Sequence, residues 1–105
     1  MAARILEASQ YRSQYASMNK TIHSRYGECV RAKLVELRSK AGLSQRQLAE
    51  KLGRERSLIG RLELGERRID MVEFFWLCKA SEADPAREAS RLMRQFEAIQ
   101  SESMV

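Results

Sequence analysis

Apolar residues recur at helical spacing along most of the chain. Between residues 28 and 41, Val30, Leu34, Leu37 and Ala41 fall on one face of a helix. Similar stripes follow, and glycine, serine or aspartate separates each one from the next. The pattern predicts an all-α fold of five helices, at residues 28–41, 44–52, 54–64, 71–81 and from Pro85 to about Ile99.

Capping residues mark where three of these helices begin. Ser44 and Gln47 have the spacing of a capping box, in which the hydroxyl and the amide each satisfy a free backbone N–H group. Asp70 is the expected N-cap of the helix at 71–81, and Asp84 followed by proline suits the start of the last helix.

The helix predicted at 54–64 has a weaker start. Arg54 stands at the expected N-cap and offers no short side-chain oxygen, although Glu55 places an anion near the positive end of the helix. Ile59 and Leu62 can still face a core. We therefore predict a helix here with a poor N-cap.

The start of the chain is less regular. Residues 1–17 carry a weak stripe of Ile5, Ala8 and Tyr11, which leaves open an additional N-terminal helix or a tail. Residues 18–26 are polar, and we expect them to be irregular.

Basic residues are concentrated in the first two thirds of the chain. The net charge is +5, and residues 1–68 hold fifteen Lys/Arg and seven Asp/Glu, whereas residues 69–105 hold four and seven. A basic surface attracts phosphate backbones and releases their counterions. A charge of +5 on 105 residues is ordinary, so alone it favours a nucleic-acid partner only slightly.

Few residues offer catalytic or metal-binding chemistry. Cys29 and Cys78 lack metal-ligand spacing, and His23 is the only histidine. We therefore expect reduced, inert thiols, no metal, no cofactor and no enzymatic activity. No apolar run approaches the ~20 residues of a membrane span, and no signal-peptide core is visible, so we expect a cytoplasmic, nucleoid-associated protein.

Residues 44–68 have the composition of two short helices that cross after a tight turn. Ala49 and Gly53 supply a small residue and a turn, while Ile59 and Leu62 can lock the second helix across the first. A helix that reads DNA must also point polar side chains outward from its N-terminal half. The polar or small residues near that face are Arg56, Ser57, Gly60 and Arg61, and the glycine would allow close approach.

A longer set of residues carries a family signature: Ala41-Gly42-Leu43-Ser44-Gln45, Leu48-Ala49, Leu52-Gly53, Ile59, Glu63, Gly65-Glu66-Arg67-Arg68 and Asp70. The set resembles the lambda-repressor-like helix-turn-helix family, also called the xenobiotic-response-element (XRE) type, from about His23 to about Pro85. The resemblance implies a five-helix DNA-binding domain. The expected divisions are an N-terminal extension (1–22), the helix-turn-helix domain (23–83) and a C-terminal helix for dimerisation or packing (84–105).

The resemblance also implies roles for individual residues. Gln45 matches a glutamine that grips a phosphate and braces the DNA-reading helix. Arg56, Ser57 and Arg61 match base-reading positions, where an arginine paired with guanine provides about 1–3 kcal/mol of discrimination. Arg46 and Arg54 could contact phosphates or be solvated surface charges. The residues assigned to DNA contact are thus Gln45, Arg46, Arg54, Arg56, Ser57 and Arg61.

Arg38 and Glu63 match a family pair that forms a structural salt bridge between the first and third helices. Two residues depart from the family pattern. Leu64 replaces a commonly polar residue, which puts a phosphate contact there in doubt, and Ile69 stands where proline is frequent.

Two apolar surfaces have more than one interpretation. Trp76 lies on a helix that is apolar on more than one side, and Leu92, Met93 and Phe96 form a narrow stripe on the last helix. Exposed aromatic residues often mark a contact surface. Both surfaces could form a homodimer interface or be covered within the chain.

These observations favour a sequence-specific regulator of transcription that binds double-stranded DNA. We expect a repressor that acts as a homodimer and reads the major groove of its operator with helix 54–64. The alternative is an antitoxin-like protein, which would bind a toxin partner through a terminal segment and also bind its own promoter. Neither hypothesis involves a membrane.

Overall fold

The computed structural model describes residues 7–19 and 24–103. Within these ranges every regular element is a helix, as the fold class predicts, and no helix there is long and apolar enough to cross a membrane. The helices are α1 (Ala8–Asn19), α2 (Arg25–Lys40), α3 (Gln45–Lys51), α4 (Arg56–Leu64), α5 (Met71–Ala80) and α6 (Pro85–Ser103).

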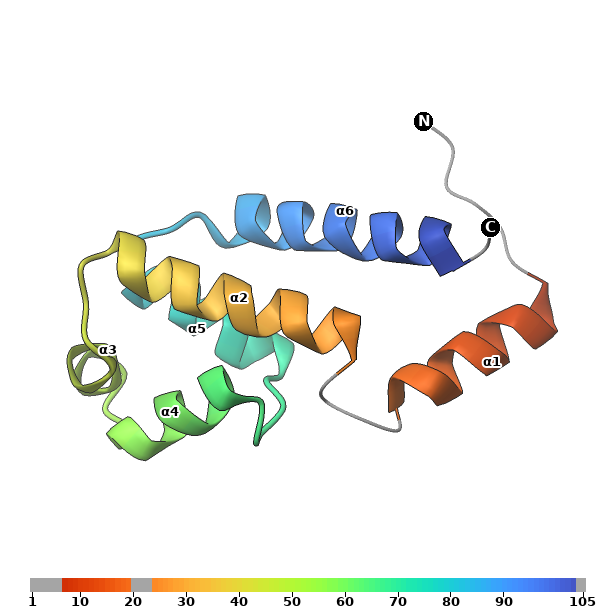
Figure 1. Cartoon of the computed structure of the whole chain (residues 1–105). Coiled ribbons are helices and arrows are strands. Elements are labelled where there is room, and N and C mark those ends of the chain that lie inside the picture. Colours follow the sequence, from red (N-terminus) through yellow and green to blue (C-terminus); the bar gives the residue numbers. More distant parts are fainter. Residues whose placement is uncertain (1–6, 20–23, 104–105) are drawn as a thin grey trace.

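Helix α2 lies at the centre of the bundle. In Figure 1, α6 runs along one side of α2 and α4 along the other, while α3 packs across the start of α4. Ion pairs join Arg25 to Glu102 and Lys33 to Glu88, so α2 and α6 are antiparallel. Helix α5 packs against α2, α3 and α6.

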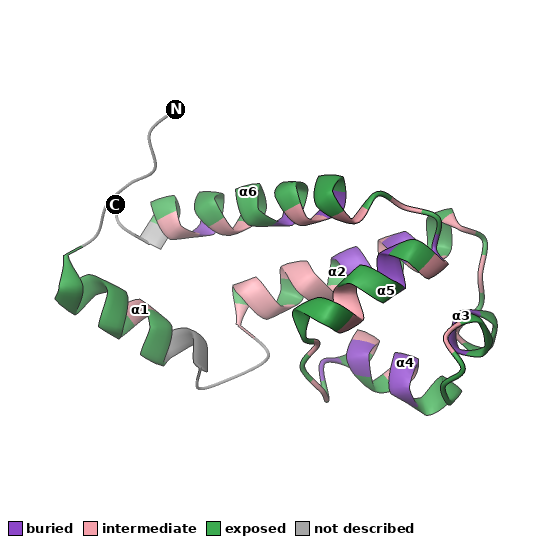
Figure 2. Cartoon of the chain, turned by 180° about the vertical axis from the view of Figure 1, so that it is seen from behind, coloured by how far each residue is buried: buried purple, intermediate pink, exposed green. Residues whose placement is uncertain are grey.

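The core forms where α2, α3, α4 and α5 meet. Figure 2 shows its buried residues on the inward faces of these helices. Ile59 of α4 and Cys78 of α5 are the largest side chains buried completely among the described residues. The buried cluster consists of Leu34, Leu48, Ala49, Leu58, Ile59, Leu62 and Leu77.

The predicted capping box at Ser44 is present, and the predicted N-cap Asp70 forms a second one with Glu73. The Ser44 hydroxyl accepts a hydrogen bond from the Gln47 backbone N–H at 3.1 Å, and the Gln47 side chain accepts one from the Ser44 N–H at 2.8 Å. Asp70 and Glu73 repeat the arrangement at the start of α5. Asp84 accepts from the Ala86 N–H at 3.0 Å at the start of α6.

Two predicted helix starts were wrong. Helix α2 begins at Arg25, three residues before the prediction, with Ser24 as its N-cap. Its first turn is held by Tyr26, whose ring packs edge-on against Phe96 of α6 at 5.4 Å between ring centroids. Such a contact between distant segments leaves no trace in the local apolar stripe.

Helix α4 begins at Arg56, and Glu55 rather than Arg54 occupies its N-cap. Arg54 still belongs to the turn, because its backbone N–H donates to the Ala49 carbonyl at 2.9 Å. The Glu55 side chain makes no capping hydrogen bond within the described part of the chain, so the start of α4 is poorly capped, as predicted.

The N-terminal region contains a helix, so of the two interpretations left open the additional helix is correct. Helix α1 extends through Asn19, into the segment expected to be irregular. Figure 2 shows α1 as almost entirely exposed; Gln14 alone is half-buried among its described side chains. The predictions for residues 1–6 and for His23 fall outside the described residues.

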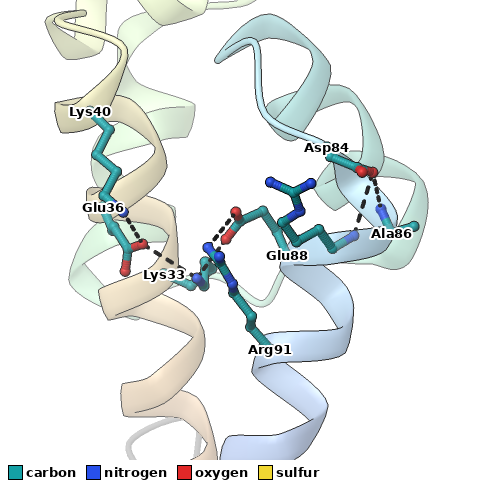
Figure 3. Close-up of polar contacts among 8 residues, drawn as sticks. Lys33, Glu36, Lys40, Asp84, Ala86, Glu88 and Arg91 are labelled. Carbon is teal, nitrogen blue, oxygen red and sulfur yellow. Dashed lines mark hydrogen bonds and ion pairs between the residues drawn. The ribbon is translucent and has the colours of Figure 1, made fainter.

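A buried ion pair links α2 to α6, and the sequence pattern did not predict it. Lys33 is only 4% exposed, and its Nζ donates to Glu88 Oε1 at 2.7 Å; Arg91 donates to the other carboxylate oxygen at 3.3 Å (Figure 3). Burying an ion pair is costly, and removing one partner costs more because it strands the other charge. The pair therefore favours one alignment of α6 on α2.

The apolar stripe of α6 mostly faces its own chain. Leu92 and Ile99 are buried, and Phe96 packs on Tyr26. Leu92 thus faces its own chain rather than a second copy, because α2 covers that side of α6. Phe96 is half-buried, and its place in a dimer interface stays a prediction. Met93 points away and is 50% exposed.

Candidate nucleic-acid interface

Helices α3 and α4 are joined by a short turn and cross closely. Ala49 is buried at 1% exposure, and its small side chain allows α4 to pass close to α3. Gly53 has a φ of +64°, a left-handed conformation that suits glycine, and it turns the chain out of α3. Ile59 and Leu62, buried on the inner side of α4, complete the packing that the sequence predicted.

A hydrogen-bonded network sets the orientation of α4. Arg38 of α2 donates two hydrogen bonds to Glu63 of α4, from Nε to Oε2 at 2.7 Å and from Nη2 to Oε1 at 3.0 Å. A third Arg38 nitrogen donates to the Leu43 carbonyl at 3.0 Å, and the Gln45 amide donates to Glu63 Oε1 at 2.9 Å. The hydrogen bond to Glu63 raises the pKa of Arg38. Side chains of α2 and α3 thus hold one carboxylate of α4.

Gly60 lies on the side of α4 that borders α3. A Cβ atom built on Gly60 would lie 3.6 Å from Gln45 Oε1, an ordinary contact distance, so the packing against α3 does not by itself require a glycine. The close approach of DNA predicted for Gly60 stays a prediction.

The three predicted base-reading residues lie on the outside of α4. Arg56, Ser57 and Arg61 are all exposed, while the opposite side of the helix is buried. Arg54, Ser57 and Arg61 line one concavity of about 500 Å³ at the turn between α3 and α4. Arg56 lies outside this concavity, and Arg46 is exposed on α3.

Glu55 is an acidic residue in the same concavity, and sequence reasoning did not assign it to the interface. The Ser57 hydroxyl donates to its carboxylate at 3.5 Å. The carboxylate reduces the positive charge of this surface, and it is an acceptor that cytosine N4 can use. The signal was present in the sequence as an acidic residue between Arg54 and Arg56, but it was interpreted only as a helix-end anion.

The end of α4 and the segment after it contain the two departures from the family pattern. Leu64, the last residue of α4, is 65% exposed, and its apolar side chain offers no polar group to a phosphate. Ile69 in the following segment packs against the core in the place of the frequent proline. Arg67 clamps this segment to α5 through two bonds to Glu73, at 3.1 and 2.7 Å. The hydrogen bond from Arg67 holds the pKa of Glu73 below its ordinary value.

Helix α5 buries one side and exposes apolar residues on the other. Cys78 faces the core, and burial raises the pKa of its thiol to about 11, which agrees with an inert cysteine. On the outer side Trp76 is 54% exposed and packs edge-on against Phe75. The large exposed hydrophobic residues of α5 are Met71, Val72, Phe75 and Trp76.

Comparison with known proteins agrees with this geometry. Residues 30–92 match a helix-turn-helix domain family. A solved structure of an XRE-family like protein from Pseudomonas syringae pv. tomato str. DC3000 is 38% identical and superposes with a TM-score of 0.66, covering 73% of this chain and 94% of that one. No curated protein matches the chain.

The chain belongs to the XRE-type, lambda-repressor-like helix-turn-helix family. It is a DNA-binding regulator, and α3 with α4 constitutes its helix-turn-helix.

Proposed function

We propose that the protein is a sequence-specific transcriptional repressor that inserts α4 into the major groove of an operator. The observation that carries the proposal is the two-sided character of α4. Its apolar side is buried and held by the Arg38–Glu63–Gln45 network, while Arg56 and Arg61 are presented to solvent. A rigidly held helix with outward arginines can pair with base edges without losing further order on binding.

The side chains of this surface divide into base-reading and phosphate-binding groups. Arg56 and Arg61 would pair with guanine O6 and N7, and Ser57 can serve as donor or acceptor. Glu55 would accept a hydrogen bond from cytosine N4 and disfavour other bases.

Phosphate contacts would fix the register of α4 on the duplex without reading sequence. Arg46 is exposed near the start of α3 and Arg54 is exposed in the turn between α3 and α4, and both are suited to this role. Gln45 is half-buried with its amide on Glu63, so a phosphate could reach it only at the start of α3. A phosphate bound to Gln45 would then also affect the hydrogen bond by which Gln45 holds Glu63 of α4.

Two copies would bind together through the exposed face of α5. Trp76 and its apolar neighbours form a continuous exposed surface on this helix, and Trp is enriched among residues that dominate binding energy. Met93 of α6 could extend the contact. The dimer would place its two α4 helices in successive major grooves, about 34–36 Å apart, on a near-palindromic site.

Selection of bound duplexes from a random DNA pool, at stated salt concentrations, tests the proposal. We expect one enriched motif with two inverted half-sites separated by one helical turn, and guanine at positions that Arg56→Ala or Arg61→Ala makes degenerate. Enrichment of no motif, with equal binding to every duplex, would contradict sequence-specific repression. A reporter gene placed behind the enriched motif then separates repression from activation.

A further inference from the structure

A cleft of about 440 Å³ opens between α1 and the end of the bundle opposite the turn between α3 and α4. Figure 1 shows α1 set apart from the bundle at this end, beyond the start of α2. The inner wall is formed by the first half of α2, part of α6 and the segment from the end of α4 to the start of α5. Its apolar residues are Tyr26, Val30, Leu34, Leu62, Ile69 and Phe96.

The inner wall is fixed by contacts that the bundle already makes. Leu34 and Leu62 belong to the buried core, and Ile69 packs against it. Tyr26 and Phe96 hold one another edge-on at 5.4 Å between ring centroids. The cleft therefore has a preformed apolar side, as small-molecule sites usually do.

The base of the cleft is shaped by the end of α4. Gly65, the C-cap of α4, has a φ of +78°, and a Cβ built there would lie 2.8 Å from Arg31 Cδ. A side chain at Gly65 would be strained and would collide with the arginine. The aliphatic stem of Arg31 thus lies across the C-cap of α4 and adds apolar surface beside the cleft.

The charged groups on the wall are already engaged. Arg67 donates to Glu73, and Arg31 and Arg68 have partners of their own. None of the described lining residues is acidic. An ionised occupant would lose its hydration without gaining an uncommitted counter-charge, and that loss is costly.

One uncommitted polar group also lines the cleft. Gln14 of α1 is half-buried, and its amide has no hydrogen-bond partner among the described residues. An amide offers both donors and an acceptor. Apolar walls with a few placed polar groups are typical of sites for small molecules.

The volume distinguishes a small molecule from a protein helix as occupant. With side chains an α-helix is about 10–12 Å across, so two turns fill roughly 1,000 Å³. The cleft offers about 440 Å³, which lies in the range of about 300–1,000 Å³ that small-molecule sites occupy. A helix from a second copy would fit only if α1 were displaced.

We propose that this cleft binds a neutral small molecule built on an aromatic or alicyclic ring system with one hydroxyl, carbonyl or amine group. The rings would lie against Leu34, Leu62 and Phe96, and the polar group would bond to the Gln14 amide. Tyr15 of α1 lines the outer side and would cover the rings.

The site has a consequence for regulation that rests on the proposed DNA-reading function. Leu62 and Gly65 belong to α4 and its cap, so an occupant of the cleft contacts the same helix that carries Arg56 and Arg61. Binding at the two sites is then coupled, and the coupling is reciprocal: the ligand changes DNA affinity by the factor by which DNA changes ligand affinity.

The first experiment measures binding of two fluorescent probes to the full chain without DNA. N-phenylnaphthylamine is neutral and carries one N–H group, and anilinonaphthalene sulfonate adds a negative charge to the same ring system. We expect one saturable site for the neutral probe, with an affinity at least equal to that for the anionic probe, because the cleft has no uncommitted cation to pair with the sulfonate. A preference of about tenfold or more for the anion overturns the neutral class of ligand, and binding that does not saturate overturns the site.

A variant that fills the cleft locates the site. Val30→Trp places an indole in the cleft and should weaken binding of the neutral probe by about tenfold or more, because the two ring systems would occupy the same space. Val35→Trp makes the same change on the same helix outside the cleft, at a position that is 37% exposed, and should leave the affinity unchanged. Circular dichroism checks that both variants fold. Unchanged affinity in a folded Val30→Trp protein, or equal weakening in both variants, contradicts the site.

Two further measurements use the wild-type protein. NMR shifts caused by the neutral probe should map to Leu62, Ile69 and Phe96, and shifts confined to the exposed face of α5 would overturn the proposal. The affinity for the selected operator, measured with and without saturating probe, should change by about threefold or more, within the usual range of coupling energies. An unchanged affinity overturns the regulatory part, whereas failure to bind DNA without probe bears on the proposed function alone.

Discussion

Helices α4 and α5 follow one another in the chain and have nearly the same length, yet their outer faces differ in kind. Both bury apolar side chains against α2: Ile59 and Leu62 from α4, and Leu77 and Cys78 from α5. Burial of apolar area drives both contacts, and this free energy does not depend on which residues lie on the opposite side of each helix.

The outer faces differ in the kind of partner that they can bind. Helix α4 exposes Arg56 and Arg61, which water solvates well and which can instead pair with the phosphates or bases of a nucleic acid. Helix α5 exposes Val72 and Trp76, which gain free energy when a second surface removes them from water. One helix is thus suited to DNA and the other to protein, although the core treats them alike.

The largest expected effect tests the shared inner faces. Ile59→Ala should lower the free energy of unfolding by about 2–5 kcal/mol, because Ile59 is completely buried and the truncation leaves a cavity. Urea denaturation followed by circular dichroism measures it. Leu64→Ala, at an exposed position of the same helix, is the matched control and should change stability by less than about 0.5 kcal/mol. Equal losses in the two variants would contradict the division into inner and outer faces.

The next effect concerns the outer face of α5. Trp76→Glu should dissociate the proposed dimer, because it would place a charge in an apolar contact where a central Trp is worth about 2 kcal/mol or more. Light scattering should record a smaller mass than for the wild type at the same concentration. Gln95→Glu adds the same charge at an exposed position of α6 and should leave the mass unchanged. A Trp76→Glu protein of wild-type mass would exclude Trp76 from the interface.

A third prediction concerns the outer face of α4. Arg56→Ala and Arg61→Ala should each weaken operator binding by about tenfold or more, as loss of a guanine contact worth about 1–3 kcal/mol implies. The thermal midpoint should stay nearly constant, since both side chains are exposed. Gel-shift titration measures the affinity, and Arg87→Ala on α6 controls for lost positive charge. Unchanged affinity in both α4 variants would show that α4 does not read bases.

The smallest expected effect concerns Glu55, the N-cap of α4. It distinguishes electrostatic repulsion of the phosphates from recognition of a base. Glu55→Gln should tighten binding to unrelated DNA by about twofold, because it removes an exposed carboxylate facing the phosphates. If Glu55 accepts a bond from cytosine N4, the same variant should relax discrimination at one base pair of the operator. The comparison of selected motifs from the two proteins decides this, and identical motifs would limit Glu55 to a repulsive role.

Local patterns predicted most of the helix boundaries and nearly all of the core. The capping boxes at Ser44 and Asp70 depend on side chains three residues apart, so the sequence contains both partners. The Arg38–Glu63 pair, implied by the family resemblance, is present with two hydrogen bonds. The base-reading and dimer assignments stay predictions until DNA binding and assembly are measured.

Features that depend on distant partners escaped the prediction. The first turn of α2 places Tyr26 against Phe96, seventy residues along the chain, in addition to its local cap at Ser24, and the buried Lys33 is paired with Glu88 of a distant helix. A lysine within a helix otherwise indicates a solvated position. The proximity of Gly60 to Gln45 of α3 is a further contact that a helical wheel does not show.

The sequence by itself determined the all-helical class, the turn at Gly53 and the residues of α4 that stay polar, because helical periodicity, capping and glycine conformation act over a few residues. Only the tertiary structure decided that α6 covers α2, that α1 forms one side of an arginine-lined cleft, and that α5 keeps Trp76 exposed. These features depend on which surfaces remain after the helices have packed. Apolar residues within each helix show only that it has a face to bury, and the competition among all the helices decides which of those faces is left open.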